Sequence, residues 1–107
     1  MSRDYTEYLE QFICCLDEER FYDAHEALEV IWFPRRFEDD LEMKLIKGFI
    51  NAAVSFELTK RGRPDSAAKV WTNYEKYRPL LDAFTSCNTP FYEALSIRIE
   101  RMRQERI

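Results

Sequence analysis

The chain has 107 residues and a mass of 12.9 kDa, so we expect residues 1–107 to form a single domain. Hydrophobic residues make up 46% of the sequence and charged residues 34%, a balance that excludes a disordered chain. Sixteen Lys and Arg against twenty Asp and Glu give a net charge of -4, which argues against a general attraction to nucleic acid or to an anionic membrane.

The sequence has no run approaching the roughly 18 uncharged apolar residues that a membrane helix requires. Its first residues also lack the apolar stretch of a signal peptide. We therefore expect a cytoplasmic protein with no membrane partner. Cys14, Cys15 and Cys87 do not have the spacing of a metal site, and we expect them to be free thiols.

Apolar residues recur at helical spacing in five segments, and no segment alternates like a strand. Two glycines and four prolines are also too few for the turns of a β-sandwich or barrel. We therefore expect an all-α fold, a small bundle of about five helices. The predicted helices are residues 4–16, 21–33, 38–61, 64–84 with an interruption at Pro79, and 89–102.

The third predicted helix is the longest, and its apolar positions fill a broad arc. An arc this wide is typical of a central helix with several neighbours. Gly48, Ala52 and Ser55 lie along one edge of this helix, where small side chains would let another backbone approach closely. A glycine that the helix merely tolerates, at a cost of about 1 kcal/mol, is the alternative interpretation of Gly48.

His25 is the only histidine, which excludes several familiar active sites. A zinc-protease helix needs H-E-x-x-H, whereas this chain has H-E-x-x-E from His25 to Glu29. A ferritin-like di-iron site needs E-x-x-H, but Tyr22 lies three residues before His25. The chain also lacks a glycine-rich phosphate loop and the glycines of a nucleophile elbow.

His25 and Glu29 are four residues apart and share one side of the second predicted helix. Helical projection places His25 in the apolar stripe and Glu29 at its border. In the third predicted helix, Glu57 interrupts the apolar face in the same way. If the two helices face one another, the three side chains would form a cluster of nitrogen and oxygen groups. Two interpretations stay open: hydrogen-bonded core residues, or a metal or catalytic site.

The run from Phe21 to Trp32, FYDAHEALEVIW, resembles the signature of a small all-helical family known as domain of unknown function 309. Members are often labelled predicted metal-dependent hydrolases. The family's hallmark is an aromatic residue followed by E-A-H-E-x-x-E-x-x-W. Here Asp23 stands in place of the first glutamate, and the other hallmark residues match.

A second block, from Gly48 to Gly62, is similar to the family's G-L-I-Q-x-A-A segment and the basic stretch that follows it. Asn51 stands in place of the glutamine, and Glu57 in place of a histidine. The resemblance covers about residues 21–67, under half of the chain. A carboxylate in place of that histidine would still suit a metal that accepts hard ligands.

The cluster and the resemblance together predict a metal site with His25, Glu29 and Glu57 as ligands to one ion of zinc, iron or manganese. Glu26 is the candidate general base for a metal-bound water, unless it is simply an exposed helix residue. The reaction would be the hydrolysis of a small-molecule substrate. We expect Trp32 to belong to the core, and the alternative is a small-molecule pocket that it lines around His25.

The alternative is a non-catalytic helical interaction module. In that case the His–Glu pairs would only fix the helix register, and the function would lie in partner binding or in formation of a homo-oligomer. Basic residues gather at 60–63 and 98–106, but glutamates interleave with the second group. We therefore expect an ion-paired helix end there rather than a nucleic-acid surface.

Overall fold

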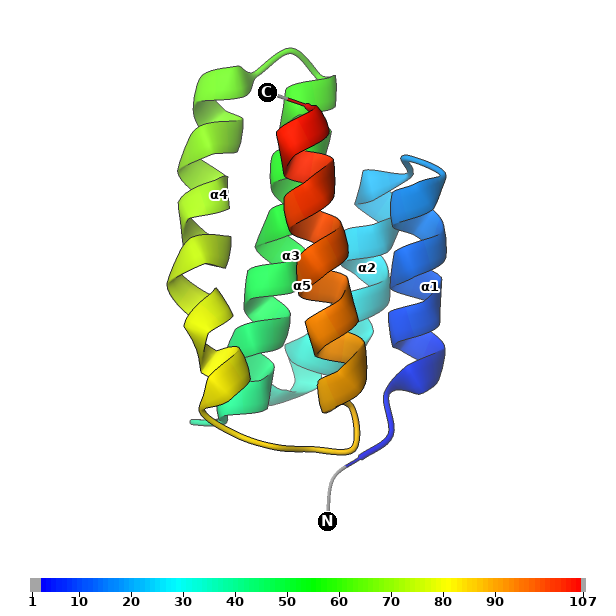
Figure 1. The fold of residues 1–107 in the computed structure, drawn as a ribbon, viewed down its shortest axis with the longest axis vertical. Helices are drawn as coiled ribbons and strands as arrows, with labels where there is room; N and C mark the ends of the chain where they lie inside the picture. The colour runs from blue at the N-terminus through cyan, green and yellow to red at the C-terminus, as the bar shows by residue number, and fades with distance from the viewer. Residues whose placement is uncertain (1–2, 107) are drawn as a thin grey trace.

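The computed structural model describes residues 3–106, and within them the chain forms five α-helices and no strand (Figure 1). The predicted all-α fold is confirmed. The elements in chain order are α1 (Thr6–Asp17), α2 (Phe21–Trp32), the 3-10 helix η1 (Phe33–Arg35), α3 (Leu41–Lys60), α4 (Pro64–Tyr77), the 3-10 helix η2 (Arg78–Asp82) and α5 (Thr89–Glu105).

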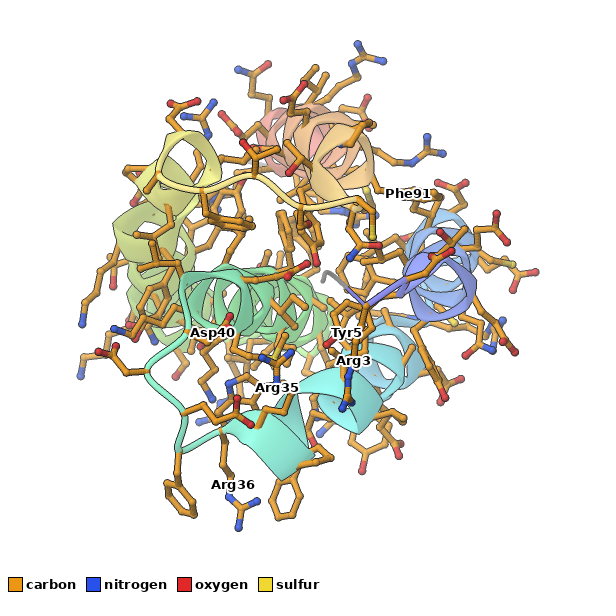
Figure 2. The ribbon with its side chains drawn as sticks, turned by 90° about the horizontal axis from the view of Figure 1, so that it is seen from below. Arg3, Tyr5, Arg35, Arg36, Asp40 and Phe91 are labelled. Carbon is orange, nitrogen blue, oxygen red and sulfur yellow. The ribbon has the colours of Figure 1, made fainter. Side chains whose placement is uncertain are left out.

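Helix α3 lies at the centre of the bundle and is the longest element, as predicted. It packs against α4 on one side and α2 on the other, α1 lies beside α2, and α5 crosses in front of α3 (Figure 1). The view from below shows the same arrangement (Figure 2). The residues of α3 that the structure fully buries confirm its broad apolar arc: Leu45, Ile46, Phe49, Ala52 and Ala53.

The ends of the helices follow local chemistry. Asp40 caps α3, because its Oδ1 accepts a hydrogen bond of 3.0 Å from the Met43 amide. Pro64 opens α4, where its missing N–H costs nothing. Before α1, Asp4 accepts hydrogen bonds from the amide and hydroxyl of Thr6, and no side chain caps the helix.

Three smaller expectations can be compared with the described residues. The predicted interruption at Pro79 falls in η2, where α4 has ended at Tyr77. All three cysteines are free thiols. Ion pairs join the second half of α5 and the residue after it to the end of α1 and the turn that follows α1: Arg98 pairs with Asp17, and Arg106 with Glu19.

Across residues 3–106, none of the helices has the length and apolar character needed to cross a membrane.

Candidate functional site

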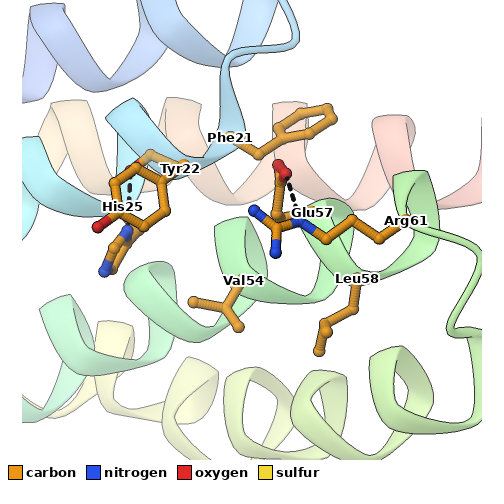
Figure 3. A pocket seen from close by; sticks show the side chains of 7 residues that line it. All are labelled: Phe21, Tyr22, His25, Val54, Glu57, Leu58 and Arg61. Carbon is orange, nitrogen blue, oxygen red and sulfur yellow. Dashed lines mark hydrogen bonds and ion pairs between the residues drawn. The ribbon is translucent and has the colours of Figure 1, made fainter.

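A pocket of about 270 Å³ opens between α2 and the second half of α3 (Figure 3). Both helices contribute apolar and polar side chains to it. The residues that line it are Phe21, Tyr22 and His25 of α2, Val54, Glu57 and Leu58 of α3, and Arg61 just beyond α3. It is therefore an apolar hollow with a few polar groups, the usual composition of a small-molecule site.

The imidazole of His25 is held by contacts within its own helix. Its Nδ1 lies 2.8 Å from the backbone oxygen of Tyr22, and its Nε2 lies 3.1 Å from Oε1 of Glu29. Both neighbours accept hydrogen bonds, so a neutral ring, which carries one N–H, can satisfy only one of them at a time. The protonated ring satisfies both. The side chain is 17% exposed, so it is largely sheltered, and it borders the pocket rather than lying in the core.

Glu57 and Arg61 form the second polar pair of the pocket. The Nε atom of Arg61 lies 3.0 Å from Oε1 of Glu57. Glu57 is largely sheltered, with 21% of its side chain exposed, whereas 62% of Arg61 is exposed. Figure 3 shows the terminal nitrogens of Arg61 extending over the pocket between Glu57 and Val54, on the side of His25. The carboxylate thus orients the guanidinium across the opening.

The predicted metal ligands are only partly brought together. His25 and Glu57 line the same pocket, but Glu29 does not line it, and Glu57 binds Arg61. Among residues 3–106, no group of three or more His, Cys, Asp and Glu side chains could hold a metal ion. The donor set therefore does not fit the predicted zinc, iron or manganese site, because a protein site for these metals needs three or four converging ligands.

Glu26, the predicted general base, lies on a different surface. It is exposed and lines two shallow hollows with Val30, away from the pocket of His25 and Glu57. Trp32 does not line the pocket, and it packs against the core, as expected. Its ring lies at the far end of α2, where Nζ of Lys47 sits 4.1 Å from the ring centroid.

Sequence reasoning missed Arg61 as part of the site, together with its apolar neighbours Val54 and Leu58. A signal for them was present in the spacing. Residues 54, 57, 58 and 61 follow the i, i+3, i+4, i+7 pattern of one helix face. Glu57 lies on this face, and the guanidinium four residues later is the natural partner of a largely sheltered carboxylate.

Neither a curated protein nor a solved structure matches the chain. A family model does match, over residues 9–70, which is more than half of the chain and contains every residue of the pocket. The chain therefore belongs to the family described as Domain of unknown function (DUF309).

Proposed function

We propose that the protein binds a small apolar molecule carrying a carboxylate group in the pocket between α2 and α3. The observation that carries this proposal is the position of Arg61, whose exposed guanidinium extends over an apolar hollow (Figure 3). A carboxylate matches the planar fork of a guanidinium, since two parallel hydrogen bonds can form.

The walls of the pocket suit a compact apolar body. Phe21, Val54 and Leu58 are its apolar lining residues, although Phe21 itself is fully buried, and the half-exposed ring of Tyr22 borders them. A volume of about 270 Å³ holds a molecule the size of a substituted benzene ring, since a dry cavity of roughly 150 Å³ is enough for benzene itself. Larger ligands would have to extend through the open side.

The charges of the pocket favour an anion over a cation. Glu57 uses one of its oxygens on Nε of Arg61, so the carboxylate is already matched by a positive charge. The terminal nitrogens of Arg61 make no hydrogen bond within residues 3–106, so they are available to an anion. Glu26, the predicted general base for hydrolysis, lies outside the pocket, and the guanidinium of Arg61 extends over it. Binding is therefore the function that we propose.

The test is an NMR titration of the ¹⁵N-labelled protein with benzoate, benzyl alcohol and benzylammonium. These probes share a ring and differ in charge. We expect benzoate to bind with a Kd of about 1 mM, as is typical of a fragment, and to shift the amides of Val54, Glu57 and Leu58. Benzyl alcohol and benzylammonium should bind at least about tenfold more weakly.

Two variants give the matched comparison. Arg61→Gln should weaken benzoate binding about tenfold, whereas Arg63→Gln, at an exposed arginine outside the pocket, should leave it unchanged. Equal binding of benzoate and benzylammonium, or benzoate shifts confined to another part of the chain, would contradict the proposal.

A further inference from the structure

The two walls of the pocket between α2 and α3 differ in chemistry. Phe21, Tyr22 and His25 line the pocket from α2, and all three side chains end in flat rings. Val54 and Leu58 line it from α3 with branched aliphatic chains. A ligand in the pocket would therefore meet aromatic rings on one side only, and this asymmetry bears on the kind of apolar body that the pocket selects.

Tyr22 and His25 form an aromatic pair at the border of the pocket (Figure 3). Their ring centroids lie 5.0 Å apart, and the ring planes meet at 65°, which is an edge-to-face arrangement. Tyr22 is 56% exposed, so the bundle leaves more than half of this residue uncovered. A ligand in the pocket would cover part of the ring of Tyr22.

His25 offers the pocket a ring surface rather than a nitrogen. Its Nδ1 lies 2.8 Å from the backbone oxygen of Tyr22, and its Nε2 lies 3.1 Å from Oε1 of Glu29. Imidazole nitrogens form hydrogen bonds in the plane of the ring, so these two acceptors on α2 use both of its polar positions. The face and the carbon edge of the ring remain for a ligand. His25 thus extends the aromatic wall and leaves the carboxylate to Arg61.

The ring of Phe21 is the fixed floor of this wall. The side chain is fully buried, and its ring centroid lies 5.5 Å from that of Phe56. The Nζ atom of Lys60 and the Cζ atom of Arg106 lie 5.9 Å and 4.9 Å from the same centroid. Because neighbours from three elements hold Phe21 in place, Tyr22 is the ring that can adjust to a ligand.

We propose that the pocket selects aryl carboxylates over alkyl carboxylates of similar size, and that Tyr22 determines this specificity. The inference rests on the proposed function, because Arg61 supplies the contact with the carboxylate. Aromatic and saturated rings both bury apolar surface, so the hydrophobic effect does not separate them strongly. An aromatic ring also gains an edge-to-face or offset-stacked contact with Tyr22, which a saturated ring does not make.

An NMR titration of the ¹⁵N-labelled protein with two acids tests the proposal. Benzoate has an aromatic ring, and cyclohexanecarboxylate has a saturated ring of similar size. We expect benzoate to bind about three- to tenfold more tightly, and nuclear Overhauser effects should connect its ring protons with those of Tyr22. Equal affinity for the two acids would overturn this inference and leave the proposed function standing. Failure of both acids to bind would overturn the two together.

Three variants test the role of Tyr22. Tyr22→Leu removes the ring and keeps an apolar side chain at a half-exposed position, so the fold should persist and the preference for benzoate should fall below about twofold. Tyr22→Phe keeps the ring and should keep the preference. Phe37→Leu removes a ring that is 89% exposed and outside the pocket, and it should leave the preference unchanged. A preference that persists in Tyr22→Leu, or that Phe37→Leu also abolishes, would overturn the assignment to Tyr22.

Discussion

Gly48 of α3 lies directly against Tyr77 at the end of α4. A Cβ atom added at Gly48 would stand 2.9 Å from the Cβ atom of Tyr77, closer than two such atoms pack in proteins. The contact is with the root of the tyrosine side chain, so rotation of its ring cannot relieve it. The close approach of α3 and α4 thus depends on the missing side chain at Gly48.

The first prediction is that Gly48→Ala destabilises the protein. In an ordinary helix this change stabilises by about 1 kcal/mol, because alanine has the higher helix propensity. Here the clash with Tyr77 should reverse the sign and lower the free energy of unfolding by about 1–3 kcal/mol. The change in the free energy of unfolding is measured by urea denaturation. Gly48→Ser should cost more than Gly48→Ala, and a gain in stability from either would show that helix propensity outweighs the contact.

The edge of small residues on α3 was predictable because helix geometry is local. Gly48, Ala52 and Ser55 follow one another at helical spacing, and the structure places α4 against this edge, as expected. Ser55 adds a hydrogen bond of 2.7 Å from its hydroxyl to the backbone oxygen of Ala67 in α4. The periodic spacing of apolar and small residues determines which side of a helix faces a neighbour. The all-α fold and the central position of α3 could therefore be predicted from the sequence.

The contacts of the site were not predictable in the same way. Projection placed His25 and Glu57 on inward faces, and both line one pocket. Spacing shows that Glu29 lies four residues from His25 and Arg61 four residues from Glu57, but it does not show that each pair closes within its own segment instead of joining the other pair. A cluster across α2 and α3 depends on how far the two helices stand apart, and spacing along one chain does not give that distance.

The second prediction concerns acid stability and rests on Glu100. Burial alone would raise the pKa of this carboxyl, but hydrogen bonds from Ser96, Arg78 and Tyr74 outweigh it and hold the pKa below its ordinary value of 4.5. A lowered pKa in the folded state means that the carboxylate stabilises the fold above pH 4.5. This contribution is lost as the pH falls through the folded-state value.

Glu100→Gln should therefore reduce stability near pH 7 and make it less dependent on pH below about 4.5. The effect is modest, because 38% of the side chain is exposed and solvent screens the charge. The free energy of unfolding is measured by chemical denaturation at a series of pH values from neutral to acidic. A Glu105→Gln variant, at an exposed carboxylate near the end of α5, is the control and should keep the acid dependence of the original chain.

The third prediction concerns the metal. Because the described donors do not converge, protein purified without a histidine tag should contain zinc, iron and manganese far below one ion per chain. Addition of each ion should leave the thermal midpoint unchanged, since a ligand stabilises the fold only by binding it. Stoichiometric metal that His25→Ala removes would contradict this and would restore the predicted site of His25, Glu29 and Glu57.

The last prediction separates a site residue from an architectural one, by comparing His25→Ala with Asn88→Ala. The contacts of His25 stay within α2 near the surface, so its loss should cost no more than about 1 kcal/mol. Asn88 is 2% exposed and joins three parts of the chain, accepting from the Tyr5 amide and donating to the Arg3 backbone oxygen and to Glu42.

Asn88→Ala leaves the buried Tyr5 amide without its hydrogen-bond acceptor. We therefore expect a loss of about 2–3 kcal/mol in the free energy of unfolding. Urea unfolding of both variants under one set of conditions gives the comparison. A cost for His25→Ala as large as that for Asn88→Ala would mean that the imidazole holds the bundle together. A small cost would leave His25 as a side chain that the fold does not require, which is what a ligand-binding residue at a pocket should be.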